Sequence, residues 1–116
     1  MDAEKFARQW LEARGLSFVD ANFHSRFGEL DLIMLDQMSL IIIEVRYRRS
    51  LRYGGPLCSV TPAKQKRIAM AAEYFRQRHN TLRNLPLRFD VLALSGLIDS
   101  PRVDWRQRAF SIDYEL

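Results

Sequence analysis

The chain has 116 residues, 47% of them hydrophobic and 28% charged, with a net charge of +4, which is ordinary for one globular domain spanning residues 1–116. Its only cysteine, Cys58, excludes an intramolecular disulfide framework, and together with two histidines it supplies too few ligands for a Cys/His zinc site. No run approaches the ~20 apolar residues of a membrane helix, and the N-terminus lacks a signal-peptide pattern, so we expect a cytoplasmic protein without membrane contact.

The spacing of apolar residues predicts an α/β fold of order αβββαββ, a mixed sheet with a helix on each side. Asp2 and Gly15 bracket the first helix, while Thr61 and Pro62 give the second an N-cap and a first-turn proline. The predicted elements are a helix over residues 2–14, strands over 17–23, 29–35 and 40–47, a helix over 61–79, and strands over 87–94 and 103–112. The loop over 50–60 is long and basic, which suits a binding loop.

The strands over 29–35 and 40–47 carry acids where strands normally carry none. A turn centred between residues 37 and 38 pairs residues whose numbers add up to 75, so Asp31 would face Glu44 and Glu29 would face Arg46. Opposed side chains have Cβ atoms ~5 Å apart, and like charges so placed are destabilising unless a cation offsets them. Mg²⁺ takes carboxylate oxygens and would do so. Alternatively, Glu29 and Arg46 form an ordinary ion pair, and Asp31 and Glu44 face water.

The apolar neighbours of these acids favour a buried site over a solvated one. Strands that are apolar on both faces are normally covered on both faces. The face opposite the acids is expected to hold Leu30, Leu32, Ile41, Ile43 and Val45. The acid face is expected to continue through Ile33, Leu35, Leu40 and Ile42.

A basic, acid-free stretch begins where the acidic pair ends. From Val45 to Ala72 the basic residues are Arg46, Arg48, Arg49, Arg52, Lys64, Lys66 and Arg67. A polyanion such as DNA or RNA is the natural partner, because phosphate contacts by Arg and Lys supply most non-specific affinity. The alternative is a solvated basic face that keeps the protein in solution.

Five stretches in order carry a family resemblance: residues 26–33, 43–49, 60–67, 88–91 and 109–110, beside a first helix with Glu4, Ala7 and Gly15. An acid on one strand, Glu-x-basic on the next and a basic helix after them resemble the PD-(D/E)xK nuclease superfamily. More closely, the chain resembles the YraN-like family of small bacterial proteins, which are similar to archaeal Holliday-junction resolvases. The resemblance implies a restriction-endonuclease-like fold, hydrolysis of phosphodiester bonds in DNA with Mg²⁺ or Mn²⁺, and a homodimer.

The resemblance also implies roles for individual residues. Asp31 and Glu44 would be metal carboxylates, the Val45 carbonyl a further ligand and Glu4 an outer contributor, while Gln65 would touch phosphate or water on the metal. Arg48, Arg49, Arg52, Lys64, Lys66 and Arg67 would contact nucleic acid. At the position of the superfamily's lysine this chain has Arg46, which stays charged and cannot act as a base.

Three functional hypotheses follow from this sequence. The first is a metal-dependent nuclease, in which Arg46 neutralises the phosphate or Lys64 or Lys66 replaces the missing lysine. The second is a nucleic-acid-binding module with the nuclease fold and weakened or lost activity. The third is a protein-interaction domain that uses its basic face.

Overall fold

The computed structural model describes residues 2–50 and 57–112, so Arg52 and the centre of the basic loop lie outside the described residues. The predicted order αβββαββ is confirmed. In chain order the elements are α1 (Ala3–Glu12), β1 (Ser17–Ser25), β2 (Gly28–Leu35), β3 (Leu40–Arg48), α2 (Pro62–Gln77), β4 (Leu87–Ser95) and β5 (Arg102–Phe110).

The helices begin where the capping residues predict, and each ends two residues before its expected end. Asp2 Oδ1 accepts the Lys5 N–H at 2.8 Å, and Thr61 Oγ1 accepts the Lys64 N–H at 3.3 Å. The backbone N–H groups of Arg14 and Gly15 bond to carbonyls three residues back, which converts the end of α1 into a turn. Neither described helix is long and apolar enough to cross a membrane.

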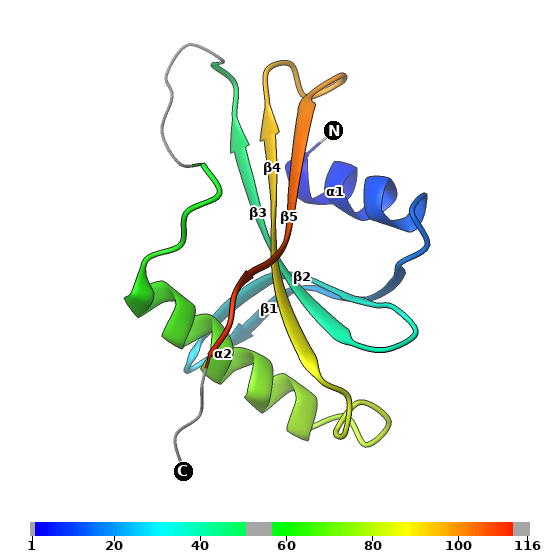
Figure 1. The fold of residues 1–116 in the computed structure, drawn as a ribbon, viewed down its shortest axis with the longest axis vertical. Coiled ribbons are helices and arrows are strands. Elements are labelled where there is room, and N and C mark those ends of the chain that lie inside the picture. The colour runs from blue at the N-terminus through cyan, green and yellow to red at the C-terminus, as the bar shows by residue number, and fades with distance from the viewer. Residues whose placement is uncertain (1, 51–56, 113–116) are drawn as a thin grey trace.

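The five strands form one mixed sheet in the order β1-β2-β3-β4-β5. Neighbouring strands are antiparallel except β3 and β4, which are parallel and are joined through α2. Two parallel strands need such a crossover, because a tight turn would make the second strand antiparallel to the first. Helices α1 and α2 lie on opposite faces of the sheet (Figure 1).

Each face of the sheet has its own apolar core, as the two-sided apolar pattern predicts. Side chains of α2 pack with Leu40 and Ile42 on one face. Side chains of α1 pack with Ile41 and Ile43 on the other. The prediction for Leu30 is wrong: it packs on the α2 face, because β2 leaves β3 at this point and continues beside β1 alone.

Candidate metal and phosphate site

The β2–β3 hairpin has the predicted register and then opens at the acids. Four pairs, from Leu35 and Leu40 to Leu32 and Ile43, have residue numbers that add up to 75. The ladder stops there, and Asp31 Oδ2 accepts the Val45 N–H at 2.9 Å. The Asp31 carboxylate thus accepts the hydrogen bond that a backbone carbonyl of β2 would otherwise accept. This bond holds Asp31 beside the part of β3 that carries Glu44.

Asp31 and Glu44 line the same pocket, of about 260 Å³, under the first turns of α2. The remaining lining residues are Gly28, Glu29, Lys64, Arg67 and Ile68. Lys64, Arg67 and Ile68 share one face of α2, since residues three and four apart lie on the same side of a helix. The hairpin therefore gives this pocket its carboxylates, and α2 gives it its cations.

Gly28 allows α2 to lie this close to the hairpin. A Cβ at Gly28 would lie 3.4 Å from the Arg67 carbonyl oxygen, at the short limit of ordinary van der Waals contact. Its φ of +154° is also one that residues with a side chain rarely adopt. The glycine thus fixes the distance between the carboxylates and the helix that carries Lys64.

Burial and like charge act together on Asp31. Glu44 is 7% exposed and Asp31 is half-buried. Burial first, and the charge of Glu44 second, raise the pKa of Asp31 from 3.8 to about 6, although the hydrogen bond from Val45 N–H opposes this rise. The charge of Glu4, in the first turn of α1, raises the same pKa. Negative charge is thus concentrated beyond what the pocket's cations offset.

Two cations approach Glu44, and only one of them closely. Lys64 Nζ lies 2.8 Å from Glu44 Oε1. Arg46 Nε lies 3.6 Å from the same oxygen and is buried without a hydrogen-bond partner. The sequence left open whether Lys64 or Lys66 would reach the acids; Lys64 does, whereas Lys66 is exposed and does not line the pocket.

The predicted pairing of Glu29 with Arg46 is wrong. Glu29 lies opposite His24 of β1, and its Oε1 is 3.0 Å from His24 Nδ1. The reason is again that residues 28–31 of β2, which precede Leu32, diverge from β3, so that Glu29 lies next to β1.

Of the described residues predicted to contact substrate, Lys64 and Arg67 line this pocket, and the others do not: Gln65, Arg48, Arg49 and Lys66. Gln65 Nε2 donates to the Val60 carbonyl at 2.8 Å and so closes the turn before α2. Arg48 and Arg49 follow at the end of β3, half-buried and exposed respectively.

The available ligands suit a hard cation rather than zinc. In strands the N–H and C=O of one residue point to the same neighbour, so the Val45 carbonyl faces Asp31 where the ladder has stopped. Within residues 2–50 and 57–112, no three His, Cys, Asp or Glu side chains form a metal cluster. Two carboxylates and a carbonyl, completed by water, are what Mg²⁺ commonly uses. These residues therefore fit Mg²⁺.

Comparison with known proteins places the chain in a family. The model of "Uncharacterised protein family UPF0102" matches residues 3–94. A UPF0102 protein of Nitrosococcus oceani is 44% identical over 111 residues, 96% of this chain and 90% of the relative. One of Alcanivorax borkumensis is 48% identical over 112 residues, 94% of this chain and 88% of the relative. The expected family is confirmed: this chain belongs to UPF0102, the family of YraN-like proteins.

Proposed function

We propose that the protein hydrolyses phosphodiester bonds in DNA, with Mg²⁺ or Mn²⁺, at the pocket of Asp31 and Glu44. The observation that carries this proposal is a half-buried carboxylate held next to a second one: burial first, and the charge of Glu44 second, raise the pKa of Asp31 to about 6. A protein gains no stability from such a pair, since a carboxylate that is hard to ionise costs free energy at neutral pH. A cation bound there would stabilise the ionised carboxylates, and the removal of this free-energy cost would strengthen its binding.

Asp31, Glu44 and the Val45 carbonyl would hold the metal, and Glu4 would add negative charge from outside. Mg²⁺ bound there would polarise the phosphate and lower the pKa of the attacking water. Lys64 and Arg67, on the opposite wall, face the same space and would bind the phosphate oxygens.

Lys64 is the residue that we assign to water activation. Its amine lies 2.8 Å from Glu44, and a lysine amine can orient or deprotonate a water. Arg46 is permanently charged and lies near the same carboxylate, so its role is to neutralise charge. In this proposal, α2 supplies the amine that β3 lacks.

A second candidate is a nucleic-acid-binding module without cleavage. It is favoured by Arg46, whose guanidinium stands in β3 beside Glu44 and weakens the pull of that carboxylate on a metal ion. DNA binding without cleavage by the wild-type protein would support this candidate.

The test is cleavage of linear, single-stranded and four-way-junction DNA in Mg²⁺, Mn²⁺ or EDTA. Lys64→Met should lower the rate by ~10²-fold or more, the usual range for loss of a proton-transferring side chain. Lys66→Met is the matched control, because it removes the same charge from an exposed position two residues away. Asp31→Asn and Glu44→Gln should abolish cleavage.

Equal rates for the two lysine variants would remove Lys64 from the mechanism. Metal-independent cleavage, or none by the wild-type protein, would refute the proposed hydrolysis. The homodimer expected from the resolvase resemblance stays a prediction, which light scattering on the purified protein measures.

A further inference from the structure

A second set of arginines lies on the same face of the sheet as Glu44, beyond the proposed metal site. The strand registers place β3, β4 and β5 residues in three successive rows across this face: Glu44, Val91 and Arg106; Arg46, Ala93 and Asp104; Arg48, Ser95 and Arg102. The rows begin at the carboxylates and end at the far end of β3. Strand β4, the middle strand of these three, contributes only small residues to the last two rows.

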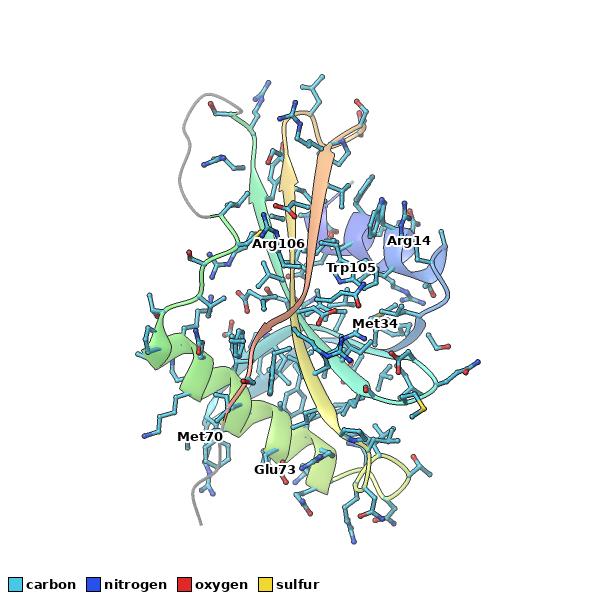
Figure 2. The ribbon with its side chains drawn as sticks, in the orientation of Figure 1. Arg14, Met34, Met70, Glu73, Trp105 and Arg106 are labelled. Atoms are coloured by element: carbon cyan, nitrogen blue, oxygen red, sulfur yellow. The ribbon has the colours of Figure 1, made fainter. Side chains whose placement is uncertain are left out.

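These small residues leave a hollow, which we call the β5 groove. It is a depression of about 760 Å³ with Ala93 and Ser95 in its floor, Arg48 on one side and arginines of β5 on the other. Residues 57–60 and Gln65 form its third side. In Figure 2, Arg106 points toward the segment before α2, whereas its neighbour Trp105 points toward α1 and Arg14. The groove thus lies on the α2 face.

The β5 groove carries excess positive charge. Of the residues that the structure describes, four arginines line it against one carboxylate: Arg48, Arg102, Arg106 and Arg108 against Asp104. Asp104 is already paired with Arg106, at 2.8 and 3.1 Å. Among the described residues, no ion pair engages the other three guanidinium groups, and Arg48 Nε is buried without a hydrogen-bond partner.

Cys58 adds no charge of its own to the groove. Its sulfur lies 3.6 Å from Asp104 Oδ2. Burial first, and the charge of Asp104 second, raise the pKa of the Cys58 thiol. The thiol therefore stays neutral at neutral pH and offsets none of the positive charge of the arginines.

A buried network holds Arg108 in the groove. Arg108 has a φ of +51°, which is costly for a residue with a side chain, at an irregularity of β5 opposite Asp90. Asp90 is 1% exposed and accepts the Arg108 N–H at 3.0 Å. The same carboxylate accepts from Arg88 at 2.8 Å and from Trp105 Nε1 at 3.0 Å. The surrounding structure thus maintains a backbone conformation that places Arg108 at the groove wall.

We propose that the β5 groove binds the sugar-phosphate backbone of one nucleic-acid strand as it leaves the Asp31/Glu44 pocket. The inference rests on the proposed function, and it names the path of the substrate. Arg48 lies about 13 Å along β3 from Glu44, and β3 and β5 are about 10 Å apart, as strand geometry requires. A row of cations along such a channel matches an extended polyanion better than a single small anion. Arginine also pairs with phosphate through two parallel hydrogen bonds.

The test is the salt dependence of binding to a fluorescent single-stranded DNA, in EDTA to prevent cleavage. The Arg48→Gln/Arg102→Gln double variant should flatten the slope of log K against log[salt] by ~1.4, about 0.7 for each phosphate contact to a single strand. Arg14→Gln/Arg83→Gln is the matched control: it removes the same charge from exposed positions outside the groove and should leave the slope unchanged.

Arg108→Gly is a second test that avoids a folding defect, because glycine tolerates the positive φ that arginine adopts here. It should flatten the slope by ~0.7 while the melting temperature stays at or above the wild-type value. The same titrations with RNA of equal sequence and with duplex DNA decide which nucleic acid the groove prefers.

The outcomes separate this inference from the proposed function. Unchanged slopes in both groove variants would overturn the β5 groove, whereas metal-dependent cleavage by the wild-type protein would still support the nuclease. Flattened slopes without any cleavage would support the groove and refute hydrolysis. A slope that falls equally in the control variant would show that net charge alone is responsible, and this also overturns the groove.

Discussion

Asp31→Asn should make the metal-free protein more stable at neutral pH, although it removes a proposed metal ligand. Asn is nearly the same size as Asp and keeps an oxygen that can accept the Val45 N–H. It lacks the charge that burial and Glu44 oppose. The substitution therefore isolates the cost of the carboxylate pair from the contribution of its hydrogen bond.

The magnitude follows from the pKa. A rise from 3.8 to about 6 corresponds to at most ~3 kcal/mol, at about 1.4 kcal/mol per pKa unit. Asp31 is only half-buried, so solvent screening reduces this to ~1–2 kcal/mol. For a domain of this size, that is a rise of about 4–8 °C in melting temperature.

The pH dependence has a definite sign. Between about pH 4 and pH 6 the folded protein holds a proton on Asp31 that the unfolded chain has released, so wild-type stability falls as pH rises through this window. The advantage of Asp31→Asn should therefore be complete above pH 6 and should shrink toward pH 4. Urea unfolding in EDTA across this pH range measures it, with Asp99→Asn at an exposed position as the control.

Added Mg²⁺ completes the experiment. It should stabilise the wild-type protein, because a ligand that binds only the folded state raises its free energy of unfolding, and it should stabilise Asp31→Asn much less. If Asp31→Asn instead lowers stability by more than 1 kcal/mol at every pH, the hydrogen bond to Val45 dominates. The argument from opposed carboxylates is then wrong.

Three further predictions concern the amine, the buried network and the close contact of α2. Arg46→Lys should restore part of the cleavage lost in Lys64→Met, because it returns a titratable amine to the same carboxylate; equal rates for the single and double variants would contradict this. Asp90→Ala should lower the free energy of unfolding by ~3–5 kcal/mol in urea, since it leaves buried donors of Trp105 and Arg108 without their acceptor and leaves Arg88 with Asp36 as its remaining partner. A loss below about 1 kcal/mol would place little weight on the network. Gly28→Ala should cost ~1–2 kcal/mol and lower cleavage, and full activity would show that the spacing of α2 is not critical.

The fold could be predicted from the sequence because its local signals agree. Asp2 and Thr61 cap the helices that they were expected to cap. The polar turn between β2 and β3 lies where it was expected, and Asp36 Oδ1 stabilises it by accepting the Met38 and Ser39 N–H groups at 2.7 and 2.6 Å. A polar turn between two apolar strands fixes the register, and a slip by one residue would turn every side chain to the other face. For this reason the proximity of Asp31 and Glu44 could be predicted from the residue numbers of the paired strands.

The rest of the site depends on contacts between elements that sequence spacing does not encode. Periodicity did not reveal that β2 pairs with β3 only from Leu32 to Leu35. The residues of β2 before Leu32 diverge from β3, and Glu29 therefore pairs with His24 instead of Arg46. The arginines of β5 were missed because they alternate with Asp104 and Trp105 and so resemble an ordinary solvated edge strand. Only the pairing of β5 with β4 places them in line with Glu44.

The position of Lys64 could have been inferred from topology. A helix that connects two parallel strands begins near the carboxyl end of the first strand, and ligands in α/β sheets gather at that end. Glu44 is the central residue of β3, and Lys64 lies in the first turn of the helix that follows. A lysine in this turn is unfavourable for the helix dipole, and Glu44 compensates for that cost at 2.8 Å.

The same ion pair explains how the proposed metal site remains folded without a metal ion. In the absence of a metal ion, Lys64 offsets the charge of Glu44, while Asp31 relieves its own charge by its raised pKa. A bound cation would remove the need for both, because it would favour the ionised form of Asp31 and free the amine of Lys64 to face the phosphate. Lys64 is therefore the residue through which metal binding and chemistry would be linked, and Lys64→Met should weaken the metal-free fold as well as slow cleavage.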